Sequence, residues 1–525
     1  MTIRVLSVAS EAVPFVKTGG LADVAGALPA AVAPHGVVMT TLLPGYPGVL
    51  SRLALAEPLA AMPVVPAAPR ARGRKSAAVK RSEKAGATLH TWPSLLGEKA
   101  TLLGGMVDGL PLLVLDCPAL FARAGGPYVD ASGRDWADNW RRFAAFGRAA
   151  ADIAAGLVPG LAFDVIHAHD WQAAMALAYL RFAPPSDAPA IPSVMTIHNM
   201  AFQGHFGSHV FGALGLPQEA FSLDGVEYHG GVGFLKAGLE AASIITTVSP
   251  TYAREIREAD RGMGLDGLIR SRNGRVRGLL NGIDTREWNP AIDPTLPERY
   301  TERSLGKRMA NKRALEAEFM LDRDDGPLFI AVTRLTWQKG MDVLAECIDH
   351  LVGLGGRLAL LGSGDAGIVH QLHAAAARHP GRIGVRIGYD EALSHRMQAG
   401  GDAILIPSRF EPCGLTQLYG LEYGCVPVVA RTGGLADTVI DANVAAVRAG
   451  AATGVQFTPV DYHGLADAIT RTIDLYRCET TWRAIQRAGM RADFSWASSG
   501  GAYAALYREL APEAALEPLP EIPTP

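Results

Sequence analysis

The sequence predicts an α/β protein in which helices cover parallel sheets and the chain is divided into two similar halves. Short runs of β-branched and aliphatic residues alternate with longer stretches of helical periodicity from end to end, which is typical of βαβ construction. Glycine makes up 58 of the 525 residues, in clusters that often follow apolar runs, as turns from strand to helix require. A six-residue segment near the N-terminus also recurs far along the chain.

The expected strands fall into two series that a polar segment separates. In the first series they are 3–9, 37–43, 112–115, 163–168, 193–198 and 244–248. In the second they are 328–332, 357–361, 384–387, 403–406 and 426–430. Helices are expected between them, and apolar residues at helical spacing after Gly340 place Cys347 on a buried helix face.

Residues 284–326 are rich in charge, proline and turn formers, so the domain boundary is expected there. The expected domains are 1–285 and 286–500, followed by a segment 501–525 that packs back and ends in a tail. The tail from Pro512 has five prolines in its last 14 residues, a composition typical of disorder. Residues 70–84 carry seven Lys or Arg against one Glu, which is typical of a solvated loop, with contact to a polymer as the alternative.

Composition limits the classes of function. Lys plus Arg number 49 and Asp plus Glu 52, so at a net charge of −3 there is no overall positive field to attract nucleic acid. The five cysteines are scattered without a Cys-x-x-Cys pair, which argues against a disulfide framework or a zinc ribbon. The N-terminal residues match a first strand better than a signal peptide, and no apolar run approaches the ~18 residues of a membrane span. We therefore expect a soluble, cytoplasmic protein with no nucleic-acid or membrane partner.

The repeated segment is the first candidate site. TGGLAD at residues 18–23 recurs unchanged at residues 432–437, and each copy is expected to open a helix. A glycine pair at a helix N-terminus lets backbone amides approach an anion, and the helix dipole favours negative charge there. Lys17 directly precedes the first copy and adds an ammonium group. We expect both glycine pairs to face one ligand; two tight turns without a ligand are the alternative.

Two cations of the second series predict a diphosphate site. Arg334 and Lys339 lie five residues apart, between the strand 328–332 and the next helix, a spacing that suits gripping a diphosphate from one side. The Gly-x-Gly of residues 362–364, at another strand exit, fits the edge of a nucleotide pocket. Neither half contains Gly-x-x-x-x-Gly-Lys-Ser/Thr, which argues against a Walker-type nucleotide triphosphatase.

Polar side chains also follow strands of the first series. His167 and His169 alternate onto one face of a strand end, as metal ligands do, but the sequence shows no clear further ligands. A neutral imidazole that hydrogen-bonds a sugar hydroxyl is the more economical interpretation. His198 and Asn199 extend this polar rim at the next strand exit, and Asp138 adds a carboxylate whose alternative role is a helix cap.

Glu411 follows the strand 403–406 and precedes a glycine-containing turn and a helix. Its carboxylate is a candidate for contact with an electron-poor carbon or its hydroxyls, while backbone amides of the turn meet phosphate. No sequence feature marks Cys413 as a nucleophile. The residues of this turn are Pro412, Cys413, Gly414, Leu415 and Thr416.

In combination these segments resemble a known family, the bacterial and plant glycogen and starch synthases, which are family 5 glycosyltransferases that use a nucleotide-glucose donor. The combination is highly specific and runs along nearly the whole chain. The resembling segments are 17–23, 135–139 with Arg142 and Phe143, 167–171, 196–199, 281–284, Arg334 with Lys339, 411–416 and 432–437.

The resemblance implies the GT-B arrangement, in which two Rossmann-like, doubly wound parallel-sheet domains face each other across a cleft, acceptor side first and nucleotide-sugar side second. It implies transfer of glucose from ADP-glucose to the non-reducing end of an α-1,4-glucan (glycogen), with retention of configuration and release of ADP. It implies no metal and no pyridoxal phosphate. The one Asp-x-Asp, at residues 322–324, falls in the expected linker, which argues against the other common, metal-dependent nucleotide-sugar fold.

The resemblance also implies roles for individual residues. Lys17 and the amides of Gly19 and Gly20 would contact the donor, and Arg334 with Lys339 would neutralise the departing diphosphate. The donor-binding set further includes Asp23, Cys413, Gly414, Leu415, Thr416, Gly433 and Gly434.

On the sugar side, Glu411 would hold the glucose hydroxyls or stabilise positive charge at the anomeric carbon. His169 would hydrogen-bond the sugar near O6, and Asp138 with Asp23 would lie near the glucosyl or acceptor site. The implied catalytic set is Glu411, His169, Asp138 and Lys339, and the implied acceptor rim is His198, Asn199 and Asn281.

The sequence leaves two alternatives. A GT-B α-glucan phosphorylase would carry pyridoxal phosphate on a lysine and show a Schiff-base absorbance band. A catalytically silent glucan-binding module would bind glucan without turnover. The sequence predicts no oligomeric state.

Overall fold

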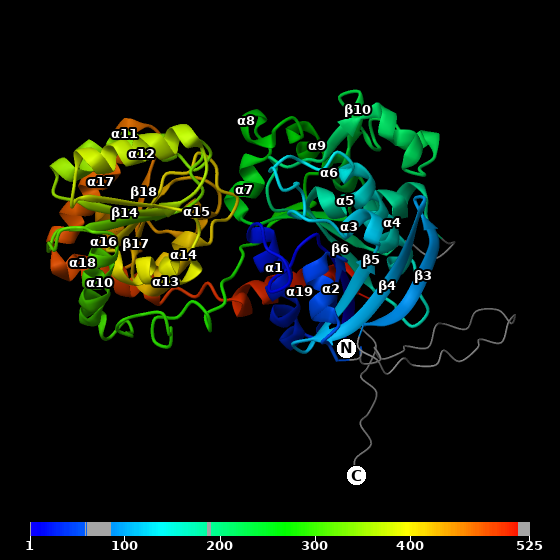
Figure 1. Ribbon diagram of the computed structural model, residues 1–525, viewed down its shortest axis with the longest axis horizontal. Coiled ribbons are helices and arrows are strands. Elements are labelled where there is room, and N and C mark those ends of the chain that lie inside the picture. The colour runs from blue at the N-terminus through cyan, green and yellow to red at the C-terminus, as the bar shows by residue number, and fades with distance from the viewer. Residues whose placement is uncertain (1, 58, 60–85, 186–190, 513–525) are drawn as a thin grey trace, which may run out of the picture. The chain divides into compact units, whose positions relative to one another are not determined.

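The computed structural model describes residues 2–57, 59, 86–185 and 191–512 (Figure 1). Its contacts divide the chain into two compact units, of which the first takes in Met1–Thr247, Ile256–Leu279 and Ser499–Pro525 and the second Val248–Glu255 and Leu280–Ser498. The short piece Val248–Glu255 therefore belongs to the second unit, although the expected range 1–285 places it in the first. The basic segment 70–84 and the tail after Pro512 lie outside the described residues.

The first unit is built on a nine-stranded sheet in the order β12-β11-β7-β6-β1-β2-β5-β4-β3. Neighbours are parallel from β12 to β5, whereas β4 is antiparallel to both β5 and β3. The strands are β1 (Ile3–Val8), β2 (Val37–Pro44), β3 (Ala87–Leu95), β4 (Glu98–Val107), β5 (Leu110–Asp116), β6 (Val165–His169), β7 (Ser193–Ile197), β11 (Ile244–Thr247) and β12 (Val276–Gly278). All six expected strands are present, and the antiparallel edge of β3 and β4 is an addition that the purely parallel prediction missed.

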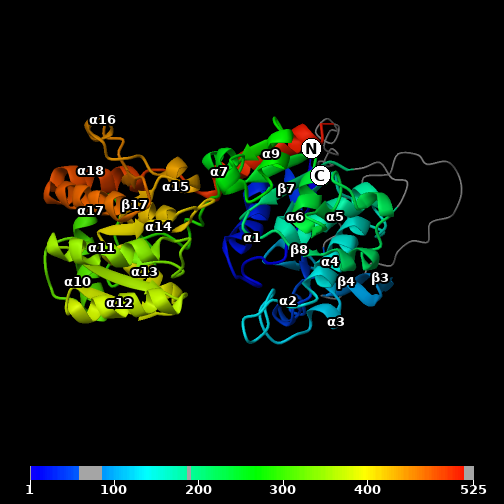
Figure 2. The same cartoon turned by 90° about the horizontal axis from the view of Figure 1, so that it is seen from above.

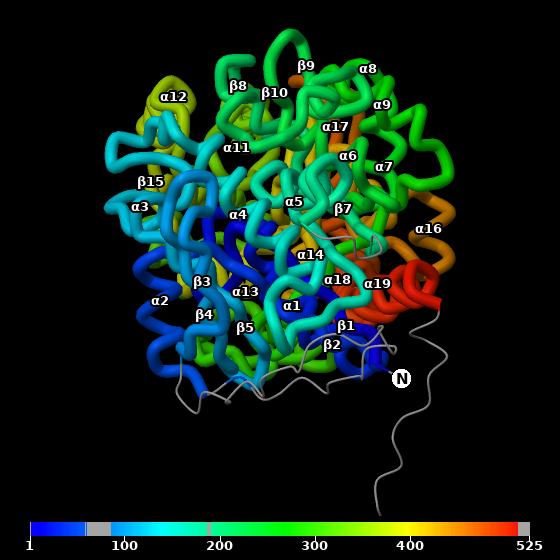
Figure 3. The backbone as a smooth tube through the Cα atoms, turned by 90° about the vertical axis from the view of Figure 1, so that its right-hand side faces the viewer, coloured from blue at the N-terminus to red at the C-terminus, as the bar shows by residue number. Residues whose placement is uncertain are grey.

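Helices α4, α5 and α6 pack side by side in this unit (Figure 2). The tube of Figure 3 shows α19 beside α1. Arg508 of α19 donates to the carbonyl of His35, which follows α1, at 2.6 Å. The helices are α1 (Gly20–Val32), α2 (Pro47–Leu53), α3 (Pro118–Phe121), α4 (Asn139–Ala154), α5 (Asp170–Phe182), α6 (Phe234–Ala241), α8 (Ala259–Gly262), α9 (Asp266–Ser271) and α19 (Trp496–Leu510). A small sheet contains β8 (His205–Gly207), β10 (Gly231–Gly233) and β9 (Glu227–Tyr228).

The second unit has a six-stranded parallel sheet in the order β15-β14-β13-β16-β17-β18. Its strands are β13 (Leu328–Val332), β14 (Arg357–Gly362), β15 (Ile383–Ile387), β16 (Ala403–Ile406), β17 (Val426–Ala430) and β18 (Val455–Phe457). Its helices are α7 (Pro250–Glu255), α10 (Arg308–Glu318), α11 (Met341–Gly353), α12 (Ala366–Arg378), α13 (Glu391–Gly400), α14 (Thr416–Tyr423), α15 (Gly433–Thr438), α16 (Val444–Arg448), α17 (Tyr462–Arg477) and α18 (Glu479–Met490). The five strands of the second series are thus confirmed.

Alternation along β13 divides the apolar core of this unit between the two faces of the sheet. Phe329 and Ala331 pack in one cluster with residues of α11, α12 and α17, and Leu328 and Ile330 pack in another with residues of α10 and α13. Cys347 is a fully buried member of the first cluster, as its helical spacing predicts. None of the described helices is both long enough and apolar enough to span a membrane.

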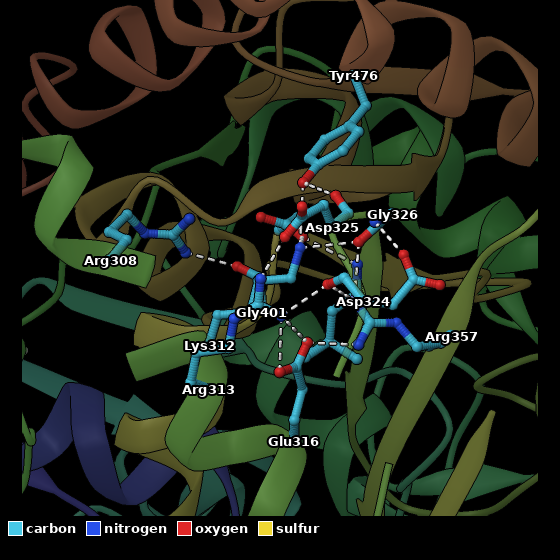
Figure 4. A network of polar contacts seen from close by, with 12 residues as sticks. Arg308, Lys312, Arg313, Glu316, Asp324, Asp325, Gly326, Arg357, Gly401 and Tyr476 are labelled. Atoms are coloured by element: carbon cyan, nitrogen blue, oxygen red, sulfur yellow. Dashed lines mark hydrogen bonds and ion pairs between the residues drawn. The ribbon is translucent and has the colours of Figure 1, made fainter. Parts of the chain in front are cut away.

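A buried polar network fixes the amino edge of this sheet (Figure 4). Arg357, the first residue of β14, is fully buried and pairs with Glu316 of α10. Its guanidinium also donates to the carbonyls of Asp322 (2.6 Å), Asp324 (2.9 Å) and Gly326 (2.8 Å).

The carboxylate of Asp324 is part of the same turn. It accepts from the Gly326 amide at 2.6 Å and from Arg382 at 2.8 Å, and these contacts lower the pKa of Asp324 to about 2. The Asp-x-Asp at residues 322–324 is therefore part of a structural turn.

The opposite, carboxyl edge of each sheet presents the polar loops. In the first unit, β1, β6 and β7 lead into the segments 9–19, 170–171 and 198–199. In the second, β13, β14, β16 and β17 lead into 333–340, 363–365, 407–415 and 431–432. Because ligands of open parallel sheets bind beyond the carboxyl ends of the strands, the sequence-predicted site residues in these segments lie on the edges where such ligands bind.

Candidate functional site

The loop before α1 presents an exposed glycine pair. A Cβ atom on Gly19 or Gly20 would meet nothing within 4 Å, and their amides donate no hydrogen bond to any described residue. Lys17 lies beside them and pairs with Asp23 of the first helical turn, with Nζ 2.7 Å from Oδ1. The first copy of the repeat thus combines free amides, a helix N-terminus and an ammonium group, as an anion site requires.

The second copy of the repeat is packed differently. Gly433 and Gly434 are buried, and a Cβ on them would collide with the carbonyls of Glu411 and Cys413. The Gly433 amide donates to Glu255 at 3.0 Å, and the Gly434 amide donates to the Glu411 carbonyl at 3.2 Å. Close packing accounts for these glycines, so the structure favours the tight-turn alternative for the second copy.

The loops after β13 and β16 bring Lys339 and Glu411 together. Lys339 Nζ lies 2.5 Å from Glu411 Oε2, and the Ser408 hydroxyl donates to the same oxygen at 2.9 Å. The Glu411 side chain is buried, whereas Arg334, on the loop that carries Lys339, is exposed and forms no ion pair with any described residue. A carboxylate, an ammonium and an exposed guanidinium thus lie on neighbouring loops of one sheet edge.

The turn after Glu411 is held by hydrogen bonds from a neighbouring side chain. Gly414 has a φ of 72°, in the left-handed region, and the Gln417 side chain donates to the carbonyls of Cys413 (3.1 Å) and Gly414 (2.9 Å). Burial raises the pKa of the Cys413 thiol to about 12, which agrees with the absence of a nucleophile signal.

Thr416 is the first residue of α14 and Leu415 is half-buried. Asn281, expected on an acceptor rim, is buried and hydrogen-bonded to Cys413.

Three histidines of the first unit form a buried cluster. His169 is fully buried, with Nε2 3.2 Å from the Ser7 hydroxyl and Nδ1 3.0 Å from Nε2 of His198. His167 contacts the hydroxyls of Thr196 (2.5 Å) and Tyr507 (2.8 Å) through its two ring nitrogens. All four ring nitrogens of His167 and His169 therefore have protein partners, and the geometry gives no support to the metal interpretation.

One group of described side chains does have the spacing of metal ligands. It consists of Glu287, Glu391 and His395, in the second unit, and does not include either histidine of the His-x-His segment.

Burial sets the charge of the cluster of His167, His169 and His198. It lowers the pKa of His169 to about 3 and the pKa values of His167 and His198 well below their usual range, so the three rings are neutral near pH 7. Burial also raises the pKa of Asp170 to about 8. This carboxylate accepts the His198 amide at 2.7 Å and so joins the exits of β6 and β7.

We expect this cluster to weaken the fold in acid. Since the pKa of His169 falls from 6.5 to about 3 on folding, only the unfolded chain binds that proton between these values, and the free energy of unfolding decreases as the pH is lowered through this window. In His169→Gln this dependence should be shallower by up to about 1.4 kcal/mol per pH unit, the share of one proton. Urea unfolding of both proteins from about pH 4 to 6.5 measures it, and equal slopes would contradict the assignment. The raised pKa of Asp170 has the opposite effect on how the free energy of unfolding depends on pH. Because both proteins contain Asp170, this effect cancels in the comparison.

Asp138 is held by a guanidinium. Arg123 contacts both of its carboxylate oxygens, at 2.6 and 2.5 Å. Asp138 occupies the N-cap position of α4, but its side chain makes no capping hydrogen bond, so the cap alternative is wrong for the carboxylate. Partial burial alone would raise the pKa of Asp138, but Arg123 outweighs this effect and holds the pKa below its usual range.

The structure adds residues that the sequence analysis missed. Glu11, a buried carboxylate after β1, accepts hydrogen bonds from Thr18 and Tyr128. Tyr389, two residues after β15, is 70% exposed on the same sheet edge as Arg334. The available signal for Glu11 was its position at a strand exit, the criterion that identified Glu411.

Comparison with known proteins agrees with this geometry. Residues 4–271 match the family described as starch synthase catalytic domain, and residues 315–488 match glycosyl transferases group 1. A glycogen synthase of Novosphingobium aromaticivorans is 70% identical over 98% of this chain and 100% of its own, and one of Mesorhizobium japonicum is 56% identical over 97% and 99%.

Solved structures support the same conclusion. The catalytic domain of starch synthase IV from Arabidopsis thaliana, bound to ADP and acarbose, has a TM-score of 0.82 at 30% identity, covering 98% of this chain and 100% of its own. A sucrose-phosphate synthase of Thermosynechococcus elongatus, with a TM-score of 0.56 at 16% identity over 98% of this chain and 100% of its own, shares the fold. The chain belongs to the glycogen and starch synthase family and is a hexosyltransferase of the GT-B fold.

Proposed function

We propose that the chain transfers glucose from ADP-glucose to the non-reducing end of an α-1,4-glucan, with retention of configuration and release of ADP. The observation that carries the proposal is the Lys339–Glu411 pair beside the exposed Arg334. It places cations for a leaving diphosphate and a carboxylate for an electron-poor carbon on one sheet edge. The similar starch synthase bound to ADP and acarbose supports this nucleotide and this class of acceptor.

The donor's diphosphate is assigned to the cations. When the bond between glucose and phosphate breaks, negative charge develops on ADP, and Arg334 with Lys339 would stabilise it from fixed positions without a metal. In the first unit, the free amides of Gly19 and Gly20 and the ammonium of Lys17 also suit an anion.

An aromatic side chain suits the donor's base. Tyr389 is exposed and follows Gly388, whose amide donates to the carbonyl of Gly362 at 3.0 Å. This contact joins Tyr389 to the Gly-x-Gly exit of β14, the expected edge of the nucleotide pocket. An aromatic ring there offers a face on which a purine stacks.

The sugar is assigned to Glu411 and the histidine cluster. Positive charge develops at the anomeric carbon as the phosphate leaves, and the carboxylate of Glu411 favours that charge. The glucan 4-hydroxyl would attack from the face that the diphosphate leaves, so that C1–O4 replaces the C1–phosphate bond and a phosphate oxygen takes the hydroxyl proton. Neutral His169 would bond a glucose hydroxyl near O6 in exchange for its present contact with Ser7.

The test compares ADP-glucose with UDP-glucose as donors for glycogen elongation, with and without EDTA. We expect faster transfer from ADP-glucose, stoichiometric ADP release and no loss of activity with the chelator. Equal or faster use of UDP-glucose would overturn the donor assignment, and a chelator-sensitive activity restored by a divalent cation would overturn the metal-free mechanism. Phosphorolysis of glycogen with a Schiff-base absorbance band would identify a phosphorylase instead.

A further inference from the structure

Glu11 joins two loops of the first unit that both carry proposed site residues. The side chain is 3% exposed, and no described Lys or Arg forms an ion pair with it. Oε1 accepts from the Thr18 hydroxyl at 2.8 Å and from the Tyr128 hydroxyl at 2.7 Å, and Oε2 accepts from the Thr18 amide. An ionised carboxylate only accepts hydrogen bonds, so these three neutral donors are what satisfies it.

On the Thr18 side, this contact orients residues 17–20, which we call the donor loop. Thr18 stands between Lys17 and the exposed Gly19, and Glu11 holds both its amide and its hydroxyl. Because the backbone is held at Thr18, the Cα atom of Lys17 and the amides of Gly19 and Gly20 have a restricted range of positions.

The Tyr128 side reaches the loop that presents Asp138. The single phenolic proton of Tyr128 goes to Glu11, so the Ser10 hydroxyl, 2.7 Å away, donates to the phenol oxygen. The Tyr128 carbonyl accepts from the Asn139 side chain at 2.9 Å and from the Trp136 amide at 3.1 Å. These two residues flank the stretch that contains Asp138.

We propose that the hydrogen bond from Tyr128 to Glu11 is a positioning contact that couples the donor loop at residues 17–20 to the loop that presents Asp138. Neither residue touches the substrates in this assignment. The inference rests on the proposed function, because it concerns how the donor and acceptor sides are held in register for transfer.

The first test removes only the hydroxyl, with Tyr128→Phe. We expect the KM values for ADP-glucose and for glycogen to rise together, each by roughly tenfold, because one buried hydrogen bond to a charged group is lost. The matched control is Tyr179→Phe in the same unit, where the hydroxyl of a buried tyrosine donates to the Leu214 carbonyl at 2.7 Å, away from the proposed site residues. Its KM values should stay within about twofold of the parent values.

A double-mutant cycle tests the contact itself. The effect of Tyr128→Phe on both KM values should shrink in the Glu11→Gln background, because the charged acceptor is already gone. Full additivity, or KM changes in Tyr128→Phe no larger than those in Tyr179→Phe, would overturn the coupling.

Hydrogen exchange of the substrate-free protein separates this inference from the proposed function. Tyr128→Phe should speed amide exchange in both residues 17–23 and 127–139, whatever the donor sugar. Exchange confined to 127–139 would overturn the coupling, whereas faster exchange in both segments of a protein that does not use ADP-glucose would overturn only the proposed function.

Discussion

Replacing Glu411 by glutamine should lower kcat for glucosyl transfer by roughly 10²–10³-fold, the size seen when one preorganised stabilising group is removed. Glutamine keeps the shape of the side chain and can still accept from Ser408, so the change isolates the negative charge. That charge is assigned to the developing positive charge of the anomeric carbon, which exists only in the transition state. The KM for ADP-glucose should therefore change much less than kcat.

Two further variants make this result interpretable. Lys339→Met should also lower kcat, and the double variant should lose less than the product of the two effects, because the side chains are in contact at 2.5 Å. Asp349→Asn, which removes an exposed carboxylate paired with Arg378 in the same unit, should leave kcat unchanged. A Glu411→Gln enzyme with parental kcat would remove Glu411 from the mechanism.

Replacing Arg357 by methionine should destabilise the second unit by about 3–5 kcal/mol, as expected when one partner of a buried ion pair is lost. Methionine fills part of the space but takes one of its two cations, the fully buried one, from Glu316, which keeps Arg313. It also removes a donor from three carbonyls of the 322–326 turn, of which those of Asp324 and Gly326 keep Arg313 and Lys312 (Figure 4). Denaturant unfolding followed by tryptophan fluorescence measures the change.

Arg378→Met is the control for this result. Arg378 pairs with Asp349 at 2.9 Å, but both side chains are more than half exposed, and such pairs contribute little to stability. We expect its unfolding curve to coincide closely with that of the parent. A loss in Arg357→Met no larger than in Arg378→Met would show that the turn is held by other contacts.

Local patterns were sufficient for most of the fold. The apolar runs predicted all eleven strands of the two series, because burial on both faces of a parallel strand requires a continuous apolar run. The sequence analysis missed the hairpin of β3 and β4 because buried and more exposed residues alternate in β4, which also contains Gly104 and Gly105. The pairing of β4 therefore depends on its neighbouring strands rather than on its own apolarity. The loops after β13 and β16 were predicted as one site, and Lys339 and Glu411 do meet there.

By itself the sequence determined the α/β class, the two series of strands, the family and the residue types at the carboxyl edges of the sheets. Only the tertiary structure decided what each of those residues touches. The two TGGLAD copies are identical, yet Gly19 and Gly20 are exposed whereas Gly433 and Gly434 are packed against the carbonyls of Glu411 and Cys413. The same is true of Glu11 and Tyr128, which lie 117 residues apart and meet at 2.7 Å. Periodicity is a local property of the chain, but burial and hydrogen-bond partners come from segments distant in sequence, and they set the charge, accessibility and pKa of a side chain.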